Sequence, residues 1–291
     1  MSDAATPAPK TAQETSQSGG EDEQPLQLFF ITGPLRTGSS LMARCIDDHE
    51  DAICLCESEI TRTLYPEHYL KLHVRRMTDH GFSGAQIIDL LERKRQNSVN
   101  SLLHWYMQVC PLAQQIYNKP HINHLGDKSP DIYRSKALVD FLAPNFPLIH
   151  TIRDPRAIMR SIYAQTSQSE EAKAARWEEL RGNIEAWAEH LDKPNILISK
   201  YEDLVRTPEA AMGRVYAHLG LKPSTRFMQA FERLHPRRFL WETAIDWKSG
   251  VHKAFDPAKA EVSDADLTDE QRARVYDDPL IKEFMGRFDY G

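Results

Sequence analysis

The fold is decided by one stretch near the N-terminus: Leu28-Phe29-Phe30-Ile31-Thr32-Gly33-Pro34-Leu35-Arg36-Thr37-Gly38-Ser39-Ser40-Leu41. Its apolar start is typical of a buried strand, and a helix is expected to begin at the two serines. The turn between them points successive backbone N–H groups into one hollow at the positive end of the helix dipole. The stretch therefore predicts an anion site, most simply for a phosphate.

This turn differs from the Walker A pattern G-x-x-x-x-G-K-[ST] at one decisive position. Gly33 and Gly38 have the required spacing and Ser40 stands at the Ser/Thr position, whereas Ser39 replaces the lysine. Arg36 is the cation of the turn. The pattern favours a phosphate over a magnesium-bound triphosphate, and an ordinary glycine turn before a helix stays open as an alternative.

Composition excludes several classes of protein. The chain has 291 residues, 41% of them apolar, which suits one large α/β domain or two small ones. A net charge of −6 argues against nucleic-acid binding driven by overall charge. An apolar run of about 18 residues is absent, so we expect no integral membrane segment. The start of the chain lacks an export signal and the four cysteines show no disulfide framework, so we expect a cytoplasmic protein.

The rest of the chain divides into a tail and a domain. Residues 1–25 are rich in Ala, Pro, Ser and acids and predict a disordered tail, followed by a domain over 26–291. Helical patterns separate the segments in which we expect strands, which are 27–32, 52–56, 121–125, 146–152 and 195–199. This alternation predicts an α/β fold with a doubly wound parallel sheet of the P-loop type, flanked by helices. Residues 66–118 lack a strand signal and predict an inserted helical cap on the acceptor side.

Polar side chains follow several of these strands. Under the rule that ligands bind at the carboxyl ends of parallel strands, they should converge on one edge of the sheet. Arg36 and Arg153 would then form two cationic centres, which suits a nucleotide with phosphates at two places; Ser161 lies about two helical turns after Arg153. A salt bridge of Arg153 with Asp154 or Glu57 is the alternative. Glu57 should emerge beside the phosphate turn if its strand is a neighbour of the first.

Three motifs together resemble one family. They are Gly33–Ser40, Arg153-Asp154-Pro155-Arg156 with Ser161, and Tyr201-Glu202-Asp203-Leu204. The set is similar to the sulfotransferases that use 3′-phosphoadenosine 5′-phosphosulfate (PAPS), above all to the branch with bacterial and protein-tyrosine sulfotransferases. The likeness runs from about Leu28 to the end of the chain. It implies PAPS as donor, the desulfated nucleotide PAP as product, and no metal.

The resemblance also implies roles for particular residues. The 5′-phosphosulfate would be held by Pro34, Leu35, Arg36, Thr37, Gly38, Ser39 and Ser40. Arg153 and Ser161 would hold the 3′-phosphate and Tyr201 would lie near the adenine. By a looser match, Lys248 would close over the 3′-phosphate. Lys128 in Gly126-Asp127-Lys128-Ser129-Pro130 resembles a lysine near the transferred group.

For catalysis, we expect Arg36 to hold the leaving oxygen and Glu57 to act as general base. Similar relatives place a glutamate after the corresponding strand. A helix-cap role or an ion pair with Arg62 is the alternative for Glu57, and Glu59 is the reserve base. His73, His124 and His150 are possible bases by chemistry alone, but such residues are more often core or surface histidines.

Two other functions stay open. A P-loop nucleotide kinase would need a magnesium ligand, for which Asp127 is the candidate, and a non-catalytic protein would keep only the nucleotide site. The acceptor is a small molecule, glycan, lipid or peptide; the sequence assigns neither the acceptor nor an oligomeric state.

Overall fold

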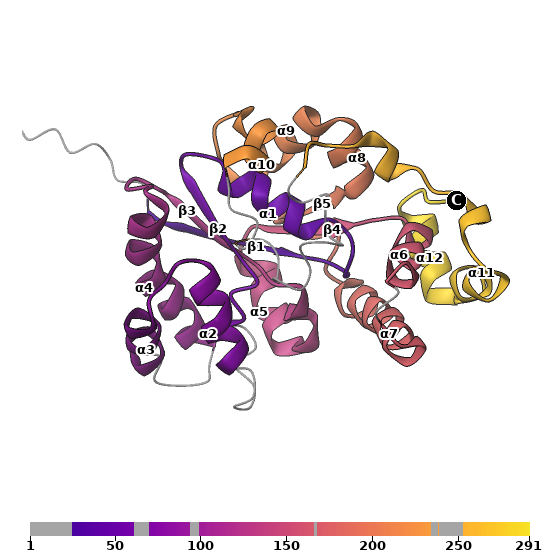
Figure 1. Cartoon of the computed structure of the whole chain (residues 1–291), viewed down its shortest axis with the longest axis horizontal. Helices are drawn as coiled ribbons and strands as arrows, with labels where there is room; N and C mark the ends of the chain where they lie inside the picture. The colour runs from indigo at the N-terminus through magenta and orange to yellow at the C-terminus, as the bar shows by residue number, and fades with distance from the viewer. Residues whose placement is uncertain (1–24, 61–69, 94–98, 166–167, 234–237, 239–252) are drawn as a thin grey trace, which may run out of the picture.

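A computed structural model describes residues 25–60, 70–93, 99–165, 168–233, 238 and 253–291. Its centre is a parallel sheet with the strand order β2-β3-β1-β4-β5 (Figure 1). The strands are β1 (Gln27–Thr32), β2 (Ala52–Cys56), β3 (His124–Lys128), β4 (Leu148–Ile152) and β5 (Ile196–Lys200). The predicted tail falls almost wholly outside the described residues.

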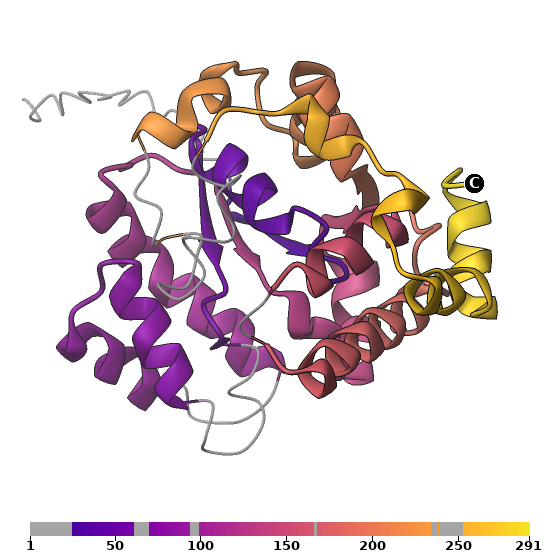
Figure 2. The same cartoon turned by 45° about the vertical axis from the view of Figure 1, so that its right-hand side comes forward.

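Helices cover both faces of the sheet, as a doubly wound fold requires. One face carries α1 (Ser39–Asp47), α8 (Tyr201–Arg206), α9 (Pro208–Leu219) and α10 (Ala230–Arg233), and the other α5 (Lys136–Asn145) and α7 (Glu170–Trp187) (Figure 1). Beyond β5, α11 (Asp269–Tyr276) packs on α6 (Pro155–Tyr163) and α12 (Pro279–Arg287) packs on α7 (Figure 2). Short 3₁₀ helices are η3 (Pro130–Arg134), η4 (Arg226–Gln229), η8 (Pro257–Ala260) and η9 (Asp264–Asp266).

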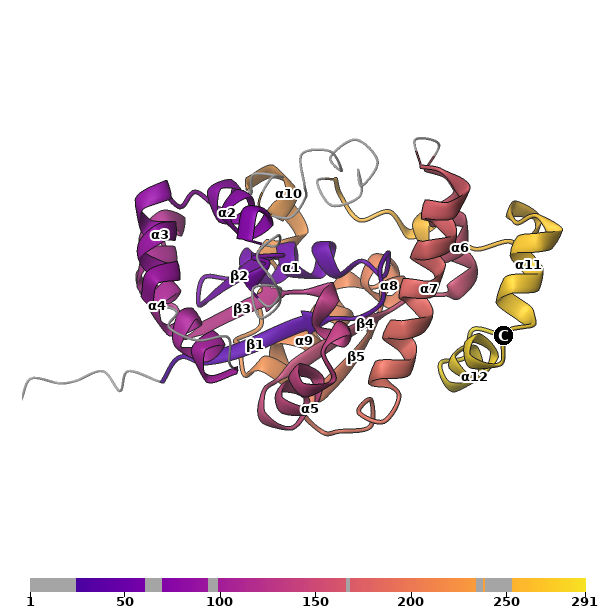
Figure 3. The same cartoon turned by 90° about the horizontal axis from the view of Figure 1, so that it is seen from below.

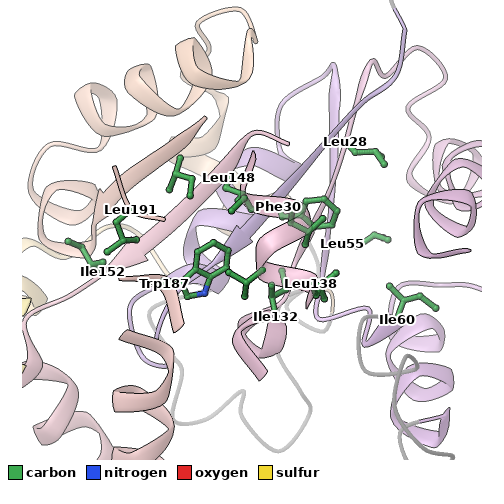
Figure 4. Packing of buried hydrophobic residues seen from close by; sticks show 14 of the residues in the cluster. Leu28, Phe30, Leu55, Ile60, Ile132, Leu138, Leu148, Ile152, Trp187 and Leu191 are labelled. Atoms are coloured by element: carbon green, nitrogen blue, oxygen red, sulfur yellow. The ribbon is translucent and has the colours of Figure 1, made fainter. Parts of the chain in front are cut away.

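Alternation along the strands divides the core into two clusters. Phe29 and Ile31 of β1 pack with α1 and α9, whereas Phe30 packs in the cluster on the opposite face. The second cluster includes Leu148 of β4 and Trp187 of α7 (Figure 4). Because β1 is buried on both sides, its residues Leu28 to Ile31 are all apolar.

The described part of 66–118 consists of helices, as predicted. These are α2 (Leu70–Asp79), α3 (Gly84–Arg93) and α4 (Val99–Tyr117), which lie together beside β2 and β3 (Figure 3). Trp105 and Tyr106 of α4 are buried in the same cluster as Phe30, so this helical group shares a core with the sheet.

The third strand differs from its prediction. It spans His124–Lys128 instead of 121–125, because Gly126 accommodates the Phe29 ring, which would lie 2.2 Å from a side-chain Cβ at that position. Gly126, which suggested a turn in the sequence, is therefore a strand residue that allows the Phe29 ring to lie close to its backbone. In addition, β3 lies between β1 and β2, so the condition that placed Glu57 directly beside the phosphate turn is not met.

Candidate functional site

Both glycines of the first turn are required by their surroundings. Gly33 has φ +128°, and a Cβ there would lie 2.2 Å from the Thr151 carbonyl oxygen. Gly38 has φ +82°, and a Cβ there would lie 2.4 Å from Cδ2 of Tyr201. The turn is thus pressed against β4 on one side and covered by the Tyr201 ring on the other. An alanine at either position would require both a strained backbone and a displaced neighbour.

A threonine pair fixes the turn to the sheet. The Thr37 hydroxyl lies 2.7 Å from the Pro34 carbonyl oxygen and 2.7 Å from the Thr151 hydroxyl. Thr151 in turn donates to the Thr32 carbonyl oxygen at 3.1 Å. These bonds hold the loop rigid before helix α1 begins at Ser39, and so preorganise its backbone N–H groups.

Arg36 connects the two motifs that were predicted to bind phosphate. Its Nε donates to the Ser161 hydroxyl on α6 at 2.8 Å, while its carbonyl oxygen accepts from Arg153 at 3.3 Å. Its backbone is left-handed, with φ 68°. That conformation costs a non-glycine residue about 1–2 kcal/mol, so the surrounding contacts must hold it in place.

Two guanidinium groups meet at this point. The Arg153 guanidinium lies over the Tyr201 ring at 4.2 Å, and it also donates to the Lys259 carbonyl oxygen at 3.0 Å. Burial and the nearby charge of Arg153 lower the pKa of Arg36 to about 10. Two cations held together in this way create a local potential that favours an anion.

The alternative salt bridge of Arg153 with Asp154 is not what the structure shows. Asp154 accepts instead from Arg156, at 2.7 Å to its Nη2. Glu202, next to Tyr201, accepts from the Asp154 backbone N–H at 3.0 Å and from the Tyr290 hydroxyl at 3.1 Å. The carboxylates of these two motifs therefore fix the start of α6, which leaves Arg153 directed at the phosphate turn.

Glu57 and Lys128 form a buried ion pair at the ends of β2 and β3. Their side chains are 9% and 3% exposed. Burial alone would lower the pKa of Lys128, but attraction to Glu57 and neighbouring groups raises it above the usual value. A carboxylate in contact with an ammonium group is held in its ionised form, which is the form a general base requires.

Strand register places this pair on the same face as the phosphate turn. Lys128 lies opposite Ile31 on one side and Cys56 on the other, and Ile31 and Cys56 belong to the cluster packed on α1. The Cys56 thiol contacts the Ser40 hydroxyl at 3.9 Å. In the sheet, β3 with Lys128 at its end lies between the strand that precedes Glu57 and the strand that precedes the turn.

Asp127 faces the other way. Its carboxylate accepts from the Tyr106 hydroxyl of α4 at 2.7 Å and from the Ser58 backbone N–H at 3.3 Å. Burial raises the pKa of Asp127 to about 6, partly opposed by these hydrogen bonds. Because Asp127 is on the face opposite α1, its position is unfavourable for a magnesium ion at the phosphate turn.

The three histidines lie in structural surroundings. Nδ1 of His73 contacts the Ser58 carbonyl oxygen at 2.6 Å, and Nε2 of His124 contacts the Leu219 carbonyl oxygen at 2.7 Å. His150 is 1% exposed on β4, 5.4 Å from the Trp187 ring between ring centres. Burial lowers the pKa of His150 to about 3.

Three further predictions concern Lys248, a metal ion and a membrane-spanning helix. Lys248 lies outside the described residues. Within the described ranges, His, Cys, Asp and Glu form no group of three or more suited to hold a metal ion. In the same residues, no helix has both the length and the apolar character needed to cross a membrane.

A family comparison decides the classification. The model of the sulfotransferase family matches residues 28–225, which include the phosphate turn and the Arg153 and Tyr201 motifs. The chain belongs to the sulfotransferase family. A search of curated protein sequences finds no match.

Two solved sulfotransferase domains share the fold. The sulfotransferase domain of the Synechococcus PCC 7002 olefin synthase is 18% identical, with a TM-score of 0.56 over 93% of this chain and 97% of that one. The domain from the curacin biosynthetic pathway is 15% identical, with a TM-score of 0.55 over 92% of this chain and 99% of that one. A mouse sulfotransferase solved with PAP is 13% identical, with a TM-score of 0.45 over 89% and 84% of the two chains.

Sequence reasoning missed two groups around this sulfotransferase site. Thr151 was read only as a strand residue, although its hydroxyl and carbonyl shape the phosphate turn. The sequence places Arg76 only within the helical cap and offers His73 as a possible base or an ordinary core histidine, whereas both are fully buried and contact the segment after β2. A signal was available in α2, because polar residues occupy its core-facing positions at helical spacing.

Proposed function

We propose that the protein transfers the sulfuryl group from PAPS to a hydroxyl or amine acceptor by in-line displacement. The observation that carries the proposal is the joint placement of Arg36, Ser161 and Arg153 against a turn whose glycines allow close approach. PAPS has phosphate at both ends of its ribose, and this site offers a cation to each. Family membership is the second support.

The described residues fit the donor in three ways. The turn presents backbone N–H groups at the start of α1, which suit the 5′-phosphosulfate. Arg153 and Ser161 both hydrogen-bond to Arg36, so both lie beside the turn. We assign them to the 3′-phosphate. The Tyr201 ring contacts the turn at Gly38 and lies against the Arg153 guanidinium, and we assign it, from the family resemblance, to the adenine end of the donor.

The chemistry assigned to the chain is charge stabilisation and proton removal. The donor supplies an activated sulfuryl group, and negative charge develops on the oxygen that leaves. Arg36 and the turn N–H groups are placed to stabilise that charge, an effect of about 3–4 kcal/mol for one well-placed donor. Glu57 accepts the proton of the acceptor's hydroxyl or amine group. The ion pair with Lys128 favours the ionised form of the Glu57 carboxylate and holds that carboxylate in place.

The kinase alternative has less support. Ser39 stands at the Walker lysine, and Asp127 is engaged with Ser58 and Tyr106 on the opposite face. The two functions are separated by incubating the protein with PAPS, or with magnesium-ATP, and a panel of phenol, sugar, lipid and peptide hydroxyls. Release of PAP with a sulfated product supports the proposal; phosphorylated product from ATP, with PAPS untouched, contradicts it.

A further inference from the structure

We propose that Arg76 and His73, two buried side chains of the cap helix α2, are positioning residues that hold Glu57 in place. This inference rests on the proposed function, because it assigns the cap a part in placing the general base. It goes beyond a specificity role, since it makes the cap part of the catalytic geometry.

The segment that carries Glu57 is strained. Glu57 has φ 57° and Glu59 has φ 61°, so two non-glycine residues of one short turn are left-handed. Both are less than a tenth exposed. Such a conformation persists only where the surrounding structure fixes it, and it concentrates at functional sites.

The N–H groups of the turn are held by β3. The Glu57 backbone N–H donates to the Lys128 carbonyl oxygen at 2.7 Å. The Ser58 backbone N–H donates to Asp127 at 3.3 Å, and the Ser58 hydroxyl donates to the same carboxylate. One side of the turn is thereby anchored to the sheet.

The carbonyl groups of the turn are held by α2. Arg76 donates to the Glu57 carbonyl oxygen through Nε at 3.2 Å and to the Cys56 carbonyl oxygen through Nη2. His73 Nδ1 lies 2.6 Å from the Ser58 carbonyl oxygen, which can only accept, so the proton is on Nδ1. Three successive carbonyls are therefore bound by two side chains of one helix.

An arginine is specifically suited to this task. Consecutive carbonyls of an extended strand point to opposite sides, and one guanidinium reaches both here because the backbone leaves the extended conformation at Glu57, where φ is 57°. The rigid planar fork donates in several directions at once, whereas a lysine donates from a single point. Arg76 is fully buried and also donates to Asp79 at 3.0 Å and to the Arg238 carbonyl oxygen at 3.2 Å.

The core-facing stripe of α2 supports the assignment. His73, Arg76 and Met77 of α2, with His80 directly after it, recur at helical spacing, and each is at most 1% exposed. A helix that only covered the sheet would present apolar residues there. In this helix the polar members of the stripe contact the residues that lead into the Glu57 turn, which gives their burial a function.

The test compares Arg76→Lys with a matched control, Lys119→Met. Lys119 also binds backbone carbonyls, those of His49 at 2.8 Å and Ala52 at 2.7 Å, but at the opposite end of β2. The readouts are PAP release from PAPS at saturating donor, with a hydroxyl acceptor from the panel that the wild-type protein sulfates, PAP affinity by calorimetry, and the crystal structure of each variant. We expect Arg76→Lys to lower the release rate by ~10²-fold with PAP affinity unchanged, and Lys119→Met to leave the rate unchanged.

The structural readout is independent of the reaction. In Arg76→Lys we expect Glu57 to leave its left-handed conformation and its contact with Lys128. A wild-type release rate, an unmoved Glu57, or an equal loss of PAP affinity would each overturn the inference. If wild-type protein neither binds PAP nor releases it, the proposed function fails instead, while the crystal structure still tests the placement of Glu57.

A second pair of variants covers the case in which Arg76→Lys does not fold. His73→Leu removes the donor to the Ser58 carbonyl, and His73→Asn offers an amide donor in its place. We expect the leucine variant to lose release rate and the asparagine variant to recover part of it. Equal rates in both variants would contradict a positioning role for His73.

Discussion

Arg36 and Ser161, which are 125 residues apart in sequence, are joined by a 2.8 Å hydrogen bond across the carboxyl edge of the sheet. The bond ties the phosphate turn to helix α6. One arginine thus lies between the two regions assigned to the ends of the donor. A change at this residue should affect both ends, whereas a change at Ser161 alone should affect one.

Replacing Arg36 tests the charge assigned to the turn. Arg36→Ala should lower PAP release from PAPS by at least ~10²-fold, because the leaving oxygen loses its cation. The variant should still fold, since alanine and arginine have a similar cost in the left-handed conformation, although the hydrogen bond to Ser161 is lost. Arg36→Lys should be intermediate, because it keeps the charge without the fork that reaches Ser161.

Arg134→Ala is the control, because it removes an arginine charge that lies outside the proposed site. Arg134 is 46% exposed and pairs with Asp131 and Glu179, so its loss should leave the release rate unchanged. Wild-type release by Arg36→Ala would remove Arg36 from the transfer step.

Gly38 gives a test of the shape of the turn. Gly38→Ala should destabilise the fold by about 1–2 kcal/mol and weaken PAP binding, because the new Cβ would displace the Tyr201 ring. Thermal unfolding and PAP titration measure the two effects. In contrast, Gly213→Ala in α9 meets no atom within 4 Å and should stabilise by about 1 kcal/mol. A Gly38→Ala protein with wild-type PAP affinity would argue against a donor at this turn.

Glu57 is tested by removing its charge and keeping its shape. Glu57→Gln should lower PAP release in the presence of an acceptor by ~10²–10⁴-fold while PAP affinity is kept. Its amide oxygen still accepts from Lys128, which limits the loss of stability. The matched control is Glu59→Gln, a second buried glutamate of the same turn. If Glu59→Gln loses the rate and Glu57→Gln does not, the base is Glu59.

The buried histidine on β4 predicts a pH dependence of stability. His150 has a pKa of about 3 in the fold, because of its burial, against about 6.5 in an unfolded chain. The unfolded state therefore binds more protons below about pH 6.5, so the stability contributed by neutral His150 is complete above that pH and falls with acidification. Between about pH 6.5 and 5 the loss should be about 2 kcal/mol.

Denaturant unfolding at several pH values measures this loss, and His150→Leu should remove it. His80, whose burial also lowers its pKa, acts in the same direction, so some dependence should remain in that variant. Parallel pH curves for His150→Leu and wild type would contradict the assignment.

The sequence was sufficient for the architecture because the fold depends on local patterns. The apolar run before Gly33 and the proline after Asp154 marked a strand end and a helix start, and both lie where expected. Helical periodicity identified the cap in the same way. The family followed from three short motifs, each of which can be recognised from its own local sequence.

The details that escaped the sequence depend on long-range contacts. Gly126 belongs to a strand because the Phe29 ring takes the place of its side chain, and no local pattern reports that packing. Strand order is likewise non-local, so the insertion of β3 between β1 and β2 was missed. The role of Arg76 depends on a turn that is nearby only after folding.

The most direct test of the central claim is calorimetric titration of the protein with PAP, compared with magnesium-ATP. We predict a clear heat of binding with PAP that is weakened in both Arg36→Ala and Arg153→Ala, and little or none with magnesium-ATP. The absence of heat with PAP, together with a clear heat from magnesium-ATP, would contradict the account.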